Sequence, residues 1–269
     1  MKSSHRQVVF ITGASSGIGA ALAREYAQKG AQVVLAARRI ERLQEISKAC
    51  KAEGGQTLVV SCDVTQTESL EKAYAESLRH FGRIDTLVAN AGFGVASKVE
   101  KLKIEDYERQ FNTNVWGVIR SIQTFLPEIK KNQGRMVILG SVNSYLSLPK
   151  NSPYAMSKFA IRALADSLYY EMRPYGVSVT LICPGFIKSE IRLVNNKGEF
   201  RPHAKDPIPL WLQMPAEGAA KQIYRAIQKR KKEKIITFHG KVFIFLQRHF
   251  PNFLSWLFIV FRAKGRSEP

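Results

Sequence analysis

A tyrosine and a lysine four residues apart are the side chains in this sequence best suited to proton chemistry. Tyr154 and Lys158 lie in the segment SPYAMSK, residues 152–158. On a helix this spacing places both side chains on one face, one turn apart. A neighbouring ammonium favours phenolate and lowers a phenol pKa that is ordinarily about 10. The pair indicates an acid–base group, but the same spacing is also common on solvated helix surfaces. The elements upstream must distinguish these two interpretations.

A glycine-rich turn near the N-terminus links a predicted strand to a predicted helix. The apolar run 8–11 is typical of a buried parallel strand, and TGASSGIG, residues 12–19, follows it directly. A helical pattern and a second strand, residues 31–36, complete a unit typical of dinucleotide binding. The first glycine permits a tight turn, and the others let the backbone approach a pyrophosphate at the helix N-terminus. The expected phosphate-binding residues are Gly13, Ser15, Ser16, Gly17, Ile18 and Gly19.

The end of the second strand bears on cofactor type. NAD sites place an Asp or Glu here for the ribose 2′-hydroxyl, whereas this chain has Ala36-Ala37-Arg38-Arg39. A guanidinium binds a 2′-phosphate through two parallel hydrogen bonds. We therefore expect NADP(H), with Arg38 as the main contact and Arg39 as a second, while two solvated arginines are the alternative.

Further short motifs follow in order along the chain. Asp63 lies in CDV, Asn90-Ala91-Gly92 follows a predicted strand, Ser141 precedes Tyr154 by thirteen residues, and Pro184-Gly185 precedes Ser189. With the TGxxxGxG turn and the YxxxK pair, this series resembles the short-chain dehydrogenase/reductase family over about residues 7–235. Ser189 replaces a commoner Thr. The resemblance implies cofactor contacts from Asp63, Asn90, Ala91, Gly92, Tyr154, Lys158, Pro184, Gly185, Ile187 and Ser189.

The resemblance also implies a catalytic set of Asn114, Ser141, Tyr154 and Lys158. In carbonyl reduction, Tyr154 would supply the proton and Ser141 would hydrogen-bond the same substrate oxygen. Lys158 would lower the Tyr154 pKa and hold the nicotinamide ribose, and Asn114 would position a water. We expect an NADP(H)-dependent oxidoreductase that interconverts a carbonyl and a secondary alcohol. A non-catalytic NADP(H)-binding redox sensor or scaffold is the alternative.

Alternating strand and helix patterns predict an α/β fold, a doubly wound parallel sheet of the Rossmann type, as a single domain over residues 1–238. A C-terminal amphipathic helical extension follows at 239–269. Three widely spaced cysteines are typical of reduced thiols in the cytoplasm, and the early first strand leaves no room for a signal peptide. The five histidines are scattered, so we expect no metal site. Further strands are expected at 56–61, 86–89, 135–139, 178–182 and 234–237, and helices at 40–52, 67–81, 103–131, 152–175 and 217–229.

An irregular, proline-containing segment follows the sixth strand. Residues 186–215 predict a substrate lid, because long irregular segments at this point are usually functional. Its apolar residues favour a lipophilic substrate, or they anchor the lid to the core. The expected substrate contacts are Ser141, Tyr154, Phe93, Tyr145, Phe186 and Trp211.

Two apolar, aromatic runs end the chain, beside a basic cluster at 229–234. Neither run reaches the ~20 residues that span a bilayer. They predict either a peripheral membrane contact or an arm packed on the domain or on a second subunit, with Asn252 capping the last helix. Nucleic-acid binding is one explanation for the net charge of +19, but no nucleic-acid motif accompanies it, and we expect no nucleic-acid partner. Attraction to a membrane surface explains the charge and the apolar aromatic residues together, and solubility alone accounts for some of the charge. The family resemblance implies a homodimer or homotetramer that pairs through helices 103–131 and 152–175.

Overall fold

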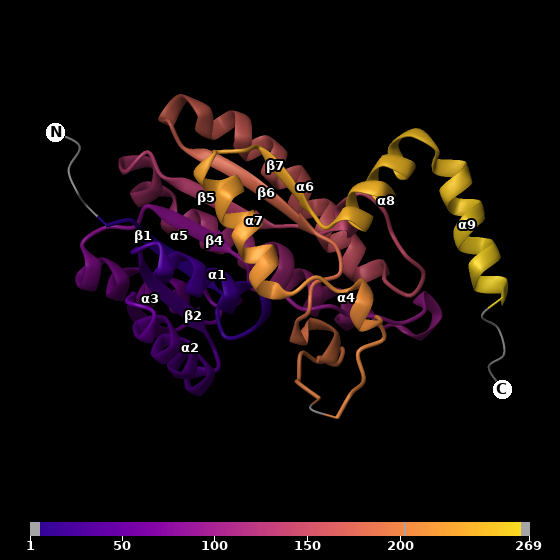
Figure 1. The fold of residues 1–269 in the computed structure, drawn as a ribbon, viewed down its shortest axis with the longest axis horizontal. Helices are drawn as coiled ribbons and strands as arrows, with labels where there is room; N and C mark the ends of the chain where they lie inside the picture. Colours follow the sequence, from indigo (N-terminus) through magenta and orange to yellow (C-terminus); the bar gives the residue numbers. More distant parts are fainter. Residues whose placement is uncertain (1–5, 202, 265–269) are drawn as a thin grey trace.

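The computed structural model describes residues 6–201 and 203–264, with side chains described as far as Val260. Its centre is a seven-stranded parallel sheet in the order β3-β2-β1-β4-β5-β6-β7 (Figure 1). Most strands are apolar on both faces, as expected for strands covered by helices on either side. The strands are β1 (Val8–Thr12), β2 (Gln32–Ala37), β3 (Gln56–Ser61), β4 (Thr86–Ala89), β5 (Arg135–Leu139), β6 (Ser178–Pro184) and β7 (Glu233–Ile236).

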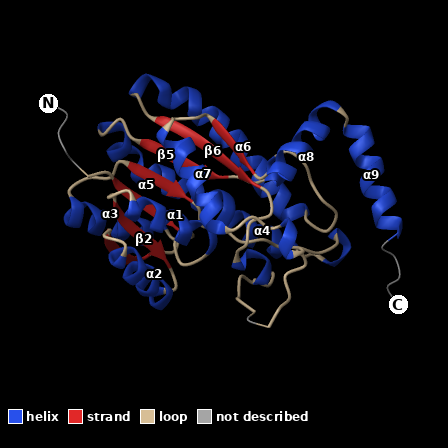
Figure 2. Ribbon diagram, in the orientation of Figure 1, coloured by secondary structure: helices blue, strands red, loops and turns tan. Residues whose placement is uncertain are grey.

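Helices cover both faces of the sheet and enclose two apolar clusters, which confirms the predicted doubly wound α/β fold (Figure 2). One face carries α1 (Gly17–Gln28), α2 (Ile40–Ala52) and α7 (Ala216–Gln228). The other carries α3 (Thr67–Phe81), α4 (Ile104–Phe111), α5 (Gly117–Lys131) and α6 (Ser152–Met172). The three cysteines are buried and unpaired.

The strand order reverses direction between β1 and β4, because β1 pairs with β2 on one side and with β4 on the other. In open parallel sheets, ligands bind beyond the carboxyl ends of the strands at such a switch point. The glycine turn follows β1, Asn90 follows β4, Ser141 follows β5 and Gly185 follows β6. The sheet therefore gathers the predicted motifs at one edge.

The helix predicted over residues 103–131 is confirmed as a continuous helical segment, but one turn within it is not α-helical. Residues Asn112–Trp116 form a π-helical turn between α4 and α5. There the buried Asn114 side chain donates to the Phe93 carbonyl, at 3.0 Å, and to Ser157 Oγ, at 3.2 Å. Turns of this kind are frequently found at functional sites. Apolar periodicity continues through the interruption, so the sequence pattern did not show it.

Two helices follow β7, namely α8 (Phe238–His249) and α9 (Pro251–Lys264). They extend away from the sheet, on the side of the molecule where α4 lies (Figure 1). Thr237 accepts a hydrogen bond from Gly240 N and so caps α8. The predicted capping role of Asn252 is wrong, because α9 already begins at Pro251, whose fixed φ suits a first helical position. Among the described residues, no helix is both long enough and apolar enough to cross a bilayer.

Candidate active site

The glycine turn forms a cradle with no room for side chains. Gly13 and Gly17 have φ of +64° and +54°, a left-handed conformation that favours glycine. A Cβ on Gly19 would lie 2.5 Å from the Gly13 carbonyl oxygen, and one on Gly17 would lie 3.0 Å from Ser189 Cβ. In the described part of the chain, no acidic residue lies in the first turn of α1 and no side chain caps it. The bare turn and the free N–H groups of α1 fit the pyrophosphate of a dinucleotide.

The segment after β4 holds this turn in place. Asn90 Nδ2 donates to the carbonyls of Thr12, at 2.9 Å, and Gly13, at 3.1 Å. Thr12 Oγ1 in turn accepts from the backbone N–H groups of Asn90 and Ala91. Asn90 thus fixes the cradle, a positioning role distinct from the direct cofactor contact that the sequence predicted. Gly92 lies against Asn114, whose Oδ1 is 3.0 Å from the position of an added Cβ.

The two arginines after β2 have different surroundings. Arg38 is exposed, whereas Arg39 donates to Ser15 Oγ at 3.2 Å and pairs with Glu190 at 2.9 Å. The Asp63 carboxylate accepts from the N–H and hydroxyl of Thr65 and so faces its own loop through Oδ1. Arg38 is therefore the guanidinium more available to a 2′-phosphate.

Tyr154 lies in the first turn of α6, with its ring beside Gly94. Burial raises the pKa of the Tyr154 phenol, while the Ser141 side chain and the positive charge of Arg192 lower it. The sequence predicted that Lys158 would lower this pKa, but in the structure burial dominates. The Lys158 Nζ lies 5.6 Å from the centroid of the Tyr154 ring.

Lys158 is buried one turn further along α6, on the same face as Tyr154. Its Nζ donates to the Leu139 carbonyl at 2.6 Å, which fixes the side chain next to the end of β5. Burial lowers the pKa of Lys158 to about 8. An amine with this pKa exchanges its proton close to neutral pH, as a proton relay requires.

Ser141 begins the short 3₁₀ turn Val142–Ser144 after β5. Its Oγ accepts from Asn143 N at 3.1 Å, and its own N–H donates to Ser144 Oγ. Both bonds hold the buried serine close enough to Tyr154 to influence the phenol. The structure therefore brings Ser141, Tyr154 and Lys158 together, and Asn114 reaches the same helix through Ser157.

The segment after β6 passes over the glycine turn. Gly185 lies against Thr237 and His239, with no room for a Cβ, and the buried Ile187 pairs with Met214. Ser189 then reaches Gly17, as described above. The predicted nicotinamide-contacting segment, Pro184 to Ser189, thus lies at the edge of the cradle.

The expected pocket walls take different positions. Phe186 stacks on His239 at 5.2 Å between ring centroids, and Phe93 is partly buried beside Asn114. Tyr145 is packed in the core, with the guanidinium groups of Arg162 and Arg248 over its ring, and Trp211 is 83% exposed. Tyr145 is therefore held by the core and by two guanidinium groups, whereas Trp211 faces solvent in this structure.

Three contacts of the segment after β6 could not be predicted from the sequence. Arg192 makes a bidentate pair with Asp206, with both bonds at 2.7 Å, and also donates to the Ile187 carbonyl and to Gln213. Glu190 pairs with Arg39. His239 Nε2 accepts from Phe186 N at 3.0 Å, and burial lowers the pKa of His239, which favours the neutral ring. No spacing rule connects these distant residues, so only the folded chain shows them.

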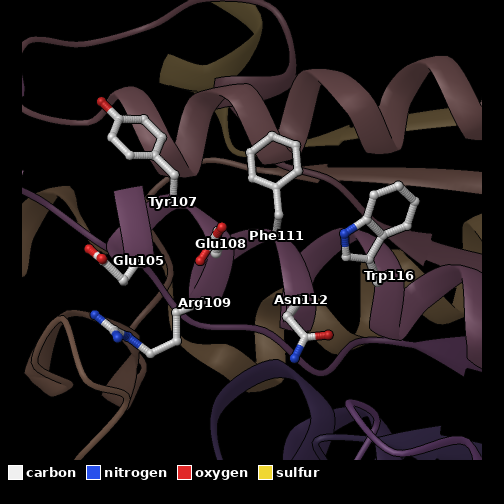
Figure 3. A pocket seen from close by; sticks show the side chains of 7 residues that line it. All are labelled: Glu105, Tyr107, Glu108, Arg109, Phe111, Asn112 and Trp116. Carbon is white, nitrogen blue, oxygen red and sulfur yellow. The ribbon is translucent and has the colours of Figure 1, made fainter. Parts of the chain in front are cut away.

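A shallow pocket lies on α4 and the π-helical turn (Figure 3). It is lined by Glu105, Tyr107, Glu108, Arg109, Phe111, Asn112 and Trp116. These residues include none of the predicted catalytic or cofactor-binding side chains. Across residues 6–201 and 203–264, no group of three His, Cys, Asp or Glu side chains has a geometry suited to a metal ion.

The chain is similar in sequence to known dehydrogenases. The 11-beta-hydroxysteroid dehydrogenase A of Sesamum indicum is 33% identical over 98% of this chain and 77% of its own length. The 11-beta-hydroxysteroid dehydrogenase-like 3 of Arabidopsis thaliana is 32% identical over 95% of this chain and 76% of its own length.

Two solved structures share the fold. An alcohol dehydrogenase of Thermococcus sibiricus, complexed with 5-hydroxy-NADP, is 28% identical with a TM-score of 0.75 and covers 86% of this chain and 96% of its own. A short-chain dehydrogenase/reductase of Burkholderia phymatum, in complex with NAD, is 25% identical with a TM-score of 0.82 and covers 94% and 97%. The family model for short chain dehydrogenases matches residues 7–199. The chain therefore belongs to the short-chain dehydrogenase family, whose members are nicotinamide-dependent oxidoreductases of alcohols and carbonyl compounds.

Proposed function

We propose that this protein is an NADP(H)-dependent oxidoreductase that interconverts a carbonyl group and a secondary alcohol on a small lipophilic molecule. The observation that carries the proposal is the buried Lys158 one helical turn from Tyr154, with Ser141 acting on the same phenol. A redox sensor that only holds the cofactor would not need this arrangement.

The three side chains divide the proton chemistry. A bound nicotinamide supplies or accepts the hydride. In the reductive direction, Tyr154 donates its phenolic proton to the substrate oxygen, and the Ser141 hydroxyl stabilises the developing negative charge. Lys158, held on the Leu139 carbonyl, provides a nearby ammonium group that returns a proton to the phenolate and itself becomes the neutral amine. Asn114 is a positioning residue that holds the Phe93 backbone and the Ser157 side chain.

Arg38 supports the choice of NADP(H). It is exposed at the carboxyl end of β2, and residues 36–39 include no carboxylate to repel a 2′-phosphate. The Arg39 guanidinium already binds Ser15 and Glu190, so it can contact a 2′-phosphate only while sharing its N–H groups with them. One structural neighbour was solved with an NADP derivative and another with NAD, so the preference rests on Arg38.

The lipophilic substrate is supported by the relatives and by the lid. Several plant relatives are named hydroxysteroid dehydrogenases. In this chain, the segment beside the cradle carries Phe186 and Ile187, and the loop beside Tyr154 carries Phe93. We expect lipid ketones, steroids and similar compounds to be better substrates than small polar carbonyls, in a domain of residues 1–238 with a lid at 186–215.

The test is a panel of carbonyls and alcohols, matched for reactivity but differing in apolar size, followed through NADPH absorbance with NADH in parallel. Turnover should rise with apolar size and should favour NADPH. A strong preference for NADH would overturn the role of Arg38. Tyr154→Phe separates an enzyme from a sensor: the enzyme loses about 10²-fold or more of its turnover but keeps its affinity for NADPH.

A further inference from the structure

The two C-terminal helices expose an unusual density of large apolar side chains. We define the C-terminal arm as residues 238–260. One face of this arm is packed on the domain, because Ile244 and Leu254 are buried in the core cluster that includes α6. The other face is open. Its exposed residues are Phe238, Val242, Phe245, Phe250, Phe253, Trp256 and Ile259.

The charges on this part of the chain have one sign. Between Glu233 and Glu268 the sequence contains no acidic residue. The same stretch contains six basic residues, which are Lys234, Lys241, Arg248, Arg262, Lys264 and Arg266. Exposed aromatic side chains beside lysines and arginines match the chemistry of an anionic bilayer surface, where rings enter the interface and cations meet lipid phosphates.

The two alternative occupants of this face fit less well. In a symmetric dimer each patch meets its own copy, so a patch with basic and no acidic residues would place like charges together. A bilayer-spanning helix needs ~20 apolar residues, whereas α8 and α9 have 12 and 14 residues and are separated at Phe250. Charge complementarity and helix length therefore favour a bilayer surface.

The arm is also fixed next to the active site. Gly240 in α8 packs against Val142, which directly follows Ser141, and a Cβ on Gly240 would lie 2.8 Å from the Val142 side chain. His239 stacks on Phe186 at the start of the predicted lid. Any surface to which the open face of the arm binds therefore lies close to the segment that carries Ser141.

We propose that the arm is an interfacial anchor that binds the surface of an anionic lipid bilayer. Phe253 and Trp256, which stack at 6.0 Å between ring centroids, insert at the headgroup level, while the exposed Lys241 lies among the lipid phosphates. The anchor does not depend on the proposed reaction, because binding to lipid is measured without turnover.

The test is cosedimentation of the full chain with vesicles of phosphatidylcholine alone or mixed with phosphatidylserine. The arm variant is Phe253→Ser with Trp256→Ser, whose side chains are 50% and 56% exposed. The matched control is Tyr170→Ser with Tyr175→Ser, at 65% and 49% exposed. Tyr170 lies near the far end of α6, about 24 Å along the helix from Tyr154, and Tyr175 ends the 3₁₀ turn that follows α6.

The wild-type chain and the control should sediment with the mixed vesicles, less so at high salt, and the arm variant should lose about tenfold or more in binding. Thermal melting of each variant verifies the fold. The proposal is overturned if the wild-type chain stays in the supernatant or if the arm variant and control bind equally. It is also overturned if light scattering shows that the arm variant only dissociates an oligomer, because a second copy would then cover the face.

Discussion

The guanidinium of Arg39 lies 2.9 Å from the carboxylate of Glu190, a contact between residues 151 positions apart. It joins the end of β2 to the segment after β6. Arg42 lies 3.5 Å from the other Glu190 oxygen. A carboxylate therefore sits beside the guanidinium groups that face a ribose 2′-phosphate in the proposed complex.

Replacing this carboxylate should change cofactor preference. Glu190→Gln removes a negative charge that repels a 2′-phosphate and competes for Arg39, so we expect KM for NADPH to fall several-fold while KM for NADH changes little. Steady-state kinetics with both cofactors measure the ratio. Arg38→Gln is the opposing control, with a higher KM for NADPH alone. Equal changes for both cofactors in Glu190→Gln would mean that the pair only holds the lid.

Arg192 and Asp206 should shift the pH profile in opposite directions. The charge of Arg192 lowers the pKa of Tyr154, and Asp206 partly neutralises that charge. In alcohol oxidation, which needs the phenolate, Arg192→Gln should move the rising limb of log kcat to higher pH, and Asp206→Asn should move it to lower pH.

Both substitutions break the same pair, so a purely structural effect on the lid predicts the same direction for both variants. Rate profiles measured with saturating cofactor therefore separate an electrostatic role of Arg192 from loosening of the lid. Parallel shifts would contradict the electrostatic role.

The sheet and the core motifs were predictable because they depend on local patterns. Apolar runs mark the buried strands, and the strands predicted for β3, β4 and β5 agree with the structure at both ends. The predicted seventh strand, 234–237, is confirmed as β7, one residue earlier. TGASSGIG needs its glycines for reasons that are local to one turn, so the spacing alone placed Gly13, Gly17 and Gly19.

The contacts of the segment after β6 were not predictable, because they join residues far apart in the chain. The pair Arg39–Glu190 and the stack of Phe186 on His239 depend on how the segment after β6 folds back over the sheet. The core position of Tyr145 depends on α8, which packs over the 3₁₀ turn after β5. Helix periodicity likewise did not reveal the π-helical turn at Asn114, since an interrupted helix keeps its apolar face.

Lys158 should give the protein a distinct pH dependence of stability. Its pKa is about 8 in the folded chain and 10.5 for the unperturbed group, so the unfolded state binds more protons between these values. The free energy of unfolding therefore rises with pH across this window, by up to about 3 kcal/mol from this residue. Denaturant unfolding of wild type and Lys158→Met from pH 7 to 10.5 isolates the contribution.

The difference between the two proteins should move in favour of wild type as the pH rises. The methionine removes the hydrogen-bond donor of the Leu139 carbonyl at every pH. This loss therefore lowers the free energy of unfolding of the variant by the same amount across the whole pH range. A difference that is constant with pH would show that Lys158 keeps an ordinary pKa in the folded chain.

Gly17 and Ser189 should be coupled through a direct contact across the cradle. Gly17→Ala places a methyl group 3.0 Å from Ser189 Cβ and forces a non-glycine residue into φ of +54°, so we expect lower stability and weaker NADPH binding. The backbone strain alone accounts for about 1 kcal/mol.

Ser189→Gly removes the Cβ that the new methyl group meets, so the double variant should recover part of the stability that Gly17→Ala loses. Urea unfolding and NADPH fluorescence titration of the four proteins complete a double-mutant cycle. Strict additivity would show that the segment after β6 moves away from the glycine turn in solution, and that Ser189 does not close the edge of the cradle.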